Sequence, residues 1–450
     1  MNTQVSTNPV LTLIAFILLV IALFILIAKW KWHVFLALLI PIITFGIIPG
    51  IQQANFIEAF EEGFGKTLGK IGVVIVLGSI IAEALKHTGA IKVITQSIIN
   101  LVGSKRIPLA LTFTGFILGI AIFSDVAYVI LNPLVHASAI ATNTGIAAMS
   151  TGLVGSLQLT HAIVPPTPGP LAAAALVGAD IGKTIVYGGV CCFFGSLACW
   201  AWGKWVAGPG IKTMGNPEFA METDKESPPS IGVIASYAPI VVPIVLITLH
   251  SVAQLYLDEG NFLRPIITYL GWPVCALTVG VWLAYRNVYS IDDKKKAKNE
   301  WIENALKGSA MILVVTGLGG SLSEILKGTP VVNYIVDFFV HYKLPAIILP
   351  FIIGVIGNMI TGSTTVGVIT AASIVAPMLS SLHLSPEAAM LSGASGSVII
   401  KYVNSSYFWV CTSLSKLSVN EGMLAYGGET LVGGLTTFFV VCILWGSGLI

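Results

Sequence analysis

A histidine beside four prolines is the first group in this sequence with a clear chemical use. The stretch HAIVPPTPGP (His161–Pro170) lies in an otherwise apolar region and also contains Thr167. Prolines remove backbone N–H donors and clash with preceding carbonyls, so we expect a helix to break here and to present polar backbone groups. His161 has three possible roles: it could carry a proton, orient a substrate, or serve as a satisfied structural residue.

A single acid stands in a second apolar region. In FSDVAYVILNP, Ser124 is followed by Asp125, with no basic residue nearby in the sequence. An acid inside a membrane-spanning segment is costly and usually marks a functional site. Asp125 could bind a proton, a cation or a cationic substrate group, or its carboxylate could be satisfied by the local backbone.

Two stretches in the C-terminal part supply hydroxyls, amides and a cation. GNMITGSTTVG (Gly357–Gly367) contains Ser363 and Thr364, and KYVNSSYFW contains Lys401, Asn404 and Ser405. Hydroxyl and amide groups suit a polyol or a carboxylate, although Ser and Thr also mediate helix packing in membranes. Lys401 would suit an anionic substrate, or it could pair with an acid or extend to the membrane interface.

The elements that position these residues are predicted to be membrane helices. The chain has 450 residues, of which 55% are hydrophobic and only 10% charged, whereas a soluble domain carries about a quarter charged residues. Apolar stretches near the spanning length of about 20 residues recur from end to end. We therefore expect an all-α polytopic protein whose partner is the lipid bilayer. A net charge of +2 gives no reason to expect a nucleic acid partner, and the six cysteines lack metal-ligand spacing.

Two of the apolar segments are too long for one spanning helix. Ile107–Ala141 and Leu344–Leu379 each have about 35 residues and polar residues at the centre. Each segment could be two full spans with a tight turn or a re-entrant hairpin that stops inside the membrane. Because each arm has only about 17 residues, we favour the re-entrant hairpin.

An internal repeat organises the chain. AAMSTGLVGS (Ala147–Ser156) matches AAMLSGASGS (Ala388–Ser397), and extending the match places the proline-rich break opposite KYVNSSYFW. We predict N-terminal helices over 1–55, a first repeat over 56–206, a cytoplasmic loop and linking helix pair over 207–300, and a second repeat over 301–450. Basic loop residues place 286–301 inside and both termini outside, so the two repeats should be inverted, each with a hairpin and a broken helix.

The sequence carries no constellation typical of an enzyme. It has no P-loop, no HExxH and no G-x-S-x-G motif, so neither ATP-driven transport nor a familiar hydrolytic reaction is indicated. We expect a transporter that is driven by an ion gradient and needs no cofactor or bound metal beyond its coupling ion.

Three motifs resemble the signatures of the gluconate permease family. They are HAIVPPTPGP, GSTTVGVITAASIVAP (Gly362–Pro377) and VNSSYFW (Val403–Trp409). The resemblance implies a multi-pass protein of the bacterial inner membrane that imports gluconate or a related sugar acid with protons. It points to substrate contacts at Ser124, His161, Thr167, Ser363, Thr364, Asn404 and Ser405, to which the residue chemistry adds Lys401. It also points to proton coupling through Asp125 and His161, and related folds suggest a homodimer.

The chain departs from the family pattern at four positions. Thr167 stands where a histidine is usual, Ser405 where an aspartate is usual, and Asp125 where a glutamate is usual, while Lys401 replaces a smaller residue. A sodium-coupled carrier of another small organic anion or of D-serine is therefore an alternative. A passive channel is a second alternative, although a channel would need a continuous polar stripe rather than four separate polar points.

Overall fold

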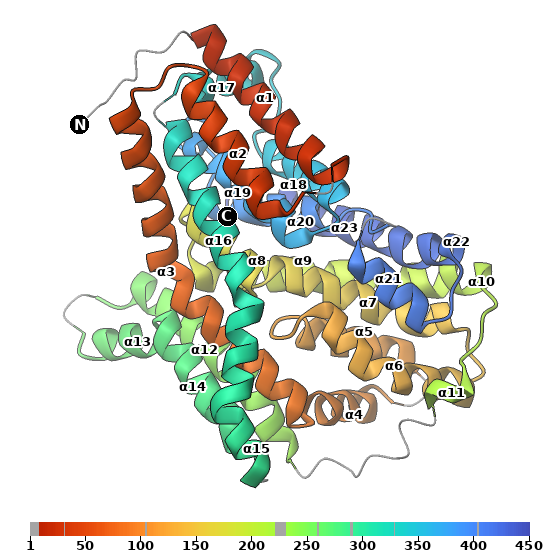
Figure 1. The fold of residues 1–450 in the computed structure, drawn as a ribbon. Coiled ribbons are helices and arrows are strands. Elements are labelled where there is room, and N and C mark those ends of the chain that lie inside the picture. Colours follow the sequence, from red (N-terminus) through yellow and green to blue (C-terminus); the bar gives the residue numbers. More distant parts are fainter. Residues whose placement is uncertain are drawn as a thin grey trace.

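The computed structural model describes residues 9–30, 32–103, 106–220, 231–258, 261–288, 291–327, 329–402 and 405–450, and these contain helices and no strand (Figure 1). The N-terminal pair is α1 (Pro9–Ala28) and α2 (Val34–Ile47). The first half then contains α3 (Gln53–His87), α4 (Ala90–Val102), α5 (Ile107–Leu118), α6 (Ser124–Ala141), α7 (Ile146–Ile163), α8 (Pro168–Val177) and α9 (Ile181–Trp202).

The middle and the second half also consist of long helices and helices interrupted by breaks. The middle contains α10 (Gly208–Gly210), α11 (Pro217–Ala220), α12 (Val233–Tyr256), α13 (Leu263–Gly271), α14 (Pro273–Arg286) and α15 (Ile291–Lys296). The second half contains α16 (Ile302–Lys327), α17 (Val331–His341), α18 (Ile348–Thr361), α19 (Thr364–Val375), α20 (Pro386–Ser397), α21 (Ser406–Leu414), α22 (Val419–Gly422) and α23 (Gly428–Gly446).

Several helices are long and apolar enough to cross a bilayer. Within the described residues there are five, or up to seven if each of two bent helix pairs counts as one span. By contrast, α5 and α19 have 12 residues each and α18 has 14, which corresponds to about 18–21 Å. A hydrocarbon core is about 30 Å thick, so these three helices are too short to cross it alone. The protein is a multi-pass membrane protein, and the short helices surround the predicted hairpin tips.

The two halves have the same order of elements and the same internal packing. In the first half α7 packs against α5, α6 and α9, and in the second half α20 packs against α18, α19 and α23. Contacts between the halves also occur in matching pairs, because α8 packs on α19 and α6 packs on α21. This correspondence agrees with the repeat read from the sequence.

The first helices of the two halves, α3 and α16, lie side by side and run in opposite directions (Figure 1). Such a crossing is what inverted repeats require. Their backbones approach closely at Gly63: a Cβ placed there would lie 2.7 Å from the carbonyl carbon of Gly320 and 2.8 Å from the Cα of Ser321. Glycine is therefore needed at this crossing because no larger side chain fits between the helices.

Some predicted boundaries differ from the structure for identifiable reasons. The apolar sequence that follows Leu68 belongs to α3, which starts earlier, at Gln53, because a polar helical segment with a Glu62–Lys66 ion pair precedes the apolar part. The amphipathic helix α4 was not predicted as a separate element, since only one of its faces is apolar and buried. The two predicted breaks are present: α7 ends at Ile163 before α8, and α20 ends at Ser397 before α21.

Candidate substrate site

The hairpin tips and the two helix breaks meet around one polar cavity of about 130 Å³. Four segments contribute: the start of α6, the last two turns of α7, the turn between α18 and α19, and the break before α21. The lining residues are Ser124, Asp125, Gln158, His161, Gly362, Ser363, Thr364, Lys401, Ser405, Ser406 and Tyr407. Hydroxyls, one cation and one acid thus converge from both halves of the chain.

The proline-rich break places His161 at this cavity. Because Pro165 and Pro166 follow, the last backbone bond of α7 runs from the Val164 N–H to the Thr160 carbonyl, 2.9 Å away. The Thr167 hydroxyl donates to the carbonyls of His161 and Val164, each at 2.8 Å. This side chain therefore satisfies helix-end carbonyls instead of facing the cavity. Thr167 was predicted to contact substrate, but the structure places it behind His161.

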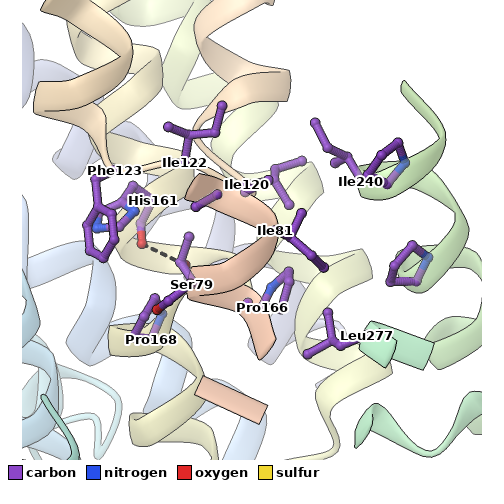
Figure 2. Close-up of a pocket in the computed structure, with 16 residues that line it drawn as sticks. Ser79, Ile81, Ile120, Ile122, Phe123, His161, Pro166, Pro168, Ile240 and Leu277 are labelled. Carbon is purple, nitrogen blue, oxygen red and sulfur yellow. Dashed lines mark hydrogen bonds between the residues drawn. The ribbon is translucent and has the colours of Figure 1, made fainter. Parts of the chain in front are cut away.

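The His161 ring separates the polar cavity from a second, small cavity. The second cavity has a volume of about 20 Å³, enough for one water, and is lined by Ser79, Pro166, Thr167 and mostly apolar side chains (Figure 2). His161 is 8% exposed and its ring lies 5.2 Å from the Phe123 ring, centre to centre. Its Nδ1 has no hydrogen-bond partner within the described residues. This nitrogen is therefore available to a proton, a water or a substrate group.

Lys401 is buried against the second hairpin tip. Its ammonium donates to Asn358 Oδ1 at 2.8 Å and to the Gly362 carbonyl at 2.9 Å, and the residue is only 3% exposed. Gly362 ends α18 with φ +72°, a left-handed conformation that turns its carbonyl toward the lysine and that other residues rarely adopt. No carboxylate lies within ion-pair distance of Lys401 in the part of the chain that the structure describes. Its positive charge is therefore solvated only by neutral oxygens.

Three helix N-termini also face the cavity. They belong to α6 at Ser124, α19 at Thr364 and α21 at Ser406. The partial positive charge of a helix N-terminus attracts anions, and its first N–H groups have no partner inside the helix. Ser363 caps α19 through its side chain, whereas Ser405 makes no such bond at the start of α21. Together with Lys401, these termini make one wall of the cavity electropositive.

Asp125 lies on the exposed side of the same cavity. Its carboxylate accepts from the Val126 N–H at 2.9 Å, and the residue is exposed. Both Asp125 and Lys401 are close enough to His161 to interact with it electrostatically. The cavity thus holds an exposed acid, a buried lysine and a histidine that interacts with both.

Seven of the predicted site residues line the cavity: Ser124, Asp125, His161, Ser363, Thr364, Lys401 and Ser405. Thr167 does not, and the predicted contact Asn404 lies outside the described residues. The sequence reasoning missed Gln158, whose amide donates to the Thr364 hydroxyl at 3.2 Å, and Tyr407. Gln158 could have been found, because it is a long polar side chain three positions before His161, and residues three apart lie on the same face of a helix.

Among the described residues no group of three or more metal-ligating side chains is close enough to hold a metal ion. The six cysteines are unpaired and buried or half-buried in apolar helices. The candidate binding groups of this cavity are its hydrogen-bonding and charged side chains.

Comparison with known proteins identifies the family. The family model of the GntP family permeases matches residues 11–446. The chain belongs to the GntP permease family. It is 30% identical to an uncharacterized permease of Haemophilus influenzae, over 97% of this chain and 93% of that protein. It is 28% identical to a gluconate permease of Pseudomonas aeruginosa, over 94% of this chain and 95% of that protein.

Other relatives of this GntP permease are named as transporters of L-idonate and D-serine. The fold resembles the solved structure of the YdaH transporter of Alcanivorax borkumensis, with a TM-score of 0.62 over 86% of this chain and 88% of that one, at 16% identity. The chain is therefore a multi-pass transporter of the bacterial inner membrane and not an enzyme.

Proposed function

We propose that this permease imports a small hydroxy-carboxylate, such as gluconate or a related sugar acid, together with protons. The observation that carries the proposal is the buried Lys401 ammonium, which has only neutral partners and lines a cavity rich in hydroxyls. A buried cation without a counter-ion is costly, and an anionic substrate would supply that counter-ion. The named substrate of the Pseudomonas relative belongs to this chemical class.

The cavity offers complementary groups for both ends of such a substrate. A carboxylate can accept from Lys401 and from the first N–H groups of α19 and α21. Sugar hydroxyls can exchange hydrogen bonds with Ser124, Ser405 and the Gln158 amide, which all line the cavity. This division of roles favours a polyhydroxy acid over a simple hydrophobic anion.

The position of Asp125 supports proton coupling. An ionised Asp125 carboxylate would repel an anionic substrate in the same small cavity, whereas a protonated Asp125 would not. Proton binding and substrate binding must therefore favour each other, and this reciprocity is the thermodynamic basis of symport. His161 lines the same cavity, interacts electrostatically with Asp125 and Lys401, and is the second candidate for the coupling proton.

Purified protein in liposomes tests the proposal. We expect an inward proton gradient to drive accumulation of radiolabelled gluconate without sodium on either side. A requirement for sodium would favour sodium coupling, and uptake without any ion gradient would favour a channel. Thermal-shift screening against aldonates, other hydroxy acids, amino acids and sulfonates tests the substrate class, and the class is wrong if no hydroxy acid stabilises the protein.

A further inference from the structure

A second carboxyl, Glu429, is buried outside the substrate cavity. It lies in the first turn of α23, is 0% exposed, and packs against α7 and α9. Its carboxyl carbon would lie 3.2 Å from a Cβ built on Gly155, and the Cys199 thiol donates to the Glu429 backbone carbonyl at 3.5 Å. Because Gly155 has no side chain, the Glu429 carboxyl fits beside it.

Within the described residues neither carboxyl oxygen of Glu429 makes a well-formed hydrogen bond, apart from a contact with the Gly155 backbone N–H, and no ion pair includes Glu429. Buried polar groups that serve only structure are nearly always hydrogen-bonded. Placing an ionised carboxylate in such a site costs many kcal/mol, so this arrangement requires the neutral, protonated acid. A fully buried acid without a cationic partner is therefore a place where a proton resides.

Among the described residues, no positively charged side chain interacts with Glu429. The titratable side chains that interact with it electrostatically are Cys199 on α9 and Tyr407 and Cys411 on α21, which are neutral in ordinary conditions. Titratable side chains on the other elements packed against α23 are engaged elsewhere. The Tyr426 hydroxyl bonds Ser150 and Ser415, and Glu387 of α20 accepts from the Asp180 N–H. His161 of α7 lines the substrate cavity. The Lys401 ammonium points to Asn358 and Gly362 instead.

Glu429 is nevertheless only one layer of side chains behind the substrate cavity. Tyr407 lines the cavity, and its hydroxyl donates at 2.9 Å to the carbonyl of Val154, the neighbour of Gly155. Thr430, the residue after Glu429, accepts from the Lys401 backbone N–H at 2.9 Å. A movement of α21 or of the break before it would therefore change the surroundings of Glu429 and of the substrate together.

We propose that Glu429 is a proton-binding residue of the transport cycle. It holds a proton on its carboxyl in the arrangement seen here and releases the proton when movement of α21 admits water or a cation. The proposal rests on the proton symport proposed above, and it assigns to α23 a proton site separate from Asp125 and His161.

Two assays in liposomes separate proton binding from substrate binding. Accumulation of radiolabelled gluconate driven by a proton gradient needs proton release, whereas counterflow exchange of gluconate across the membrane needs no net proton movement. We expect Glu429→Gln, which keeps the size of the side chain, to lower driven accumulation by about tenfold or more while counterflow stays close to wild type. Glu429→Asp, which keeps a titratable group, should retain driven accumulation. The control Glu303→Gln changes an exposed acid paired with Lys307 and should match wild type in both assays.

The other possible outcomes of these assays also decide for or against the proposal. The proposal is wrong if Glu429→Gln accumulates gluconate like wild type, if both assays fail together in a variant with normal thermal stability, or if the Asp and Gln variants behave alike. Should Glu429→Gln fail to fold, the pH dependence of driven accumulation in Glu429→Asp decides. Retained accumulation with a shifted pH profile would support the proposal, and an unchanged pH profile would contradict it. Wild-type protein that shows neither accumulation nor counterflow would contradict the proposed function itself.

Discussion

At the scale of single residues, Lys401 sets the electrostatic character of the cavity. Its two acceptors, Asn358 Oδ1 and the Gly362 carbonyl, carry no net charge, so the ammonium is oriented without being neutralised. The Asn358 amide nitrogen in turn donates to the Ile399 carbonyl at 2.8 Å, which fixes the direction of the amide oxygen. The lysine is therefore held ready for an anion rather than engaged in a structural ion pair.

We expect Lys401→Gln to weaken gluconate binding by about tenfold to a hundredfold, because a hydrogen bond to a charged group contributes about 1.5–3 kcal/mol. The half-saturating gluconate concentration in counterflow measures this effect. Lys307→Gln, which removes an exposed lysine paired with Glu303, is the matched control and should leave that concentration unchanged. Equal concentrations in the two variants would show that Lys401 does not meet the substrate.

A second substitution tests the same charge without removing it. Asn358→Asp would place a carboxylate 2.8 Å from the ammonium and should compete with an anionic substrate, raising the half-saturating concentration several-fold. Because aspartate cannot donate to Ile399, thermal stability is measured alongside. Tighter gluconate binding in Asn358→Asp would contradict the role given to Lys401.

Asp125 is predicted to couple the proton, since it is the exposed acid of the cavity. Asp125→Asn removes the repulsion between acid and substrate permanently, so gluconate should bind with little dependence on pH. Counterflow at several pH values measures this, with Glu303→Gln as the control. Unchanged pH dependence in Asp125→Asn would mean that another group carries the coupling proton.

At the scale of elements, α6 is tied to the second half by buried polar groups. The Tyr128 hydroxyl bonds Ser415 at 2.5 Å, and Ser415 in turn contacts Tyr426. His136 accepts from the Asn216 N–H at Nδ1, so its Nε2–H donates to the Leu414 carbonyl at 2.8 Å. These bonds hold the helix that presents Asp125 against the segment that follows α21.

The crossing of α3 and α16 gives a prediction about glycine. Gly63→Ala adds one methyl group where a Cβ meets the Gly320 backbone, and overpacking of this kind typically costs about 1–3 kcal/mol. The melting temperature in detergent should fall. Gly65→Ala on the same helix has nothing within 4 Å of the added carbon and should be neutral or slightly stabilising. Equal stability of the two variants would show that the helices do not cross at Gly63.

At the scale of the whole molecule, the substrate cavity belongs to neither half alone. The first half supplies one hairpin tip and Gln158 with His161, and the second half supplies the other tip and the break around Lys401. The paired packing of α8 on α19 and of α6 on α21 joins these parts. A shift of one half against the other would therefore open or close the site as a unit, as inverted-repeat carriers do.

The predicted orientation can be tested by cysteine labelling. Asp258 and Lys295 are both exposed and lie in the connectors before α13 and within α15. We expect Asp258→Cys to react with an impermeant maleimide in intact cells and Lys295→Cys to react only after permeabilisation, because the basic connector should face the cytoplasm. The wild-type chain is the control for its six native cysteines. Labelling of both positions from the same side would contradict the topology.

We also propose that the protein is a homodimer, as related ion-coupled carriers suggest. Light scattering of the purified protein, corrected for bound detergent, should give twice the chain mass of 47.5 kDa. A monomeric mass that persists in lipid nanodiscs would exclude this assembly.

The sequence by itself determined the features that arise locally along the chain. Composition predicts a membrane protein because few charged residues remain for a water-facing surface. The helix break after Ile163 follows from missing N–H groups at Pro165 and Pro166. The repeat is visible because equivalent segments kept their small residues in order. The predicted re-entrant path of the hairpins and the boundaries of the repeats remain predictions, since they concern a bilayer that the chain alone does not specify.

Only the tertiary structure decided which side chains meet. Gln158 contacts Thr364, 206 positions away, and Lys401 bonds Asn358 and Gly362 at the second hairpin tip. Thr167 turns to the backbone, although its position in the motif predicted a substrate contact. Glu429 gave no signal at the start of an apolar helix, because lack of a well-formed hydrogen bond can be seen only when all its neighbours are in place. Local chemistry fixes where a helix breaks, but packing of distant segments fixes what the break faces.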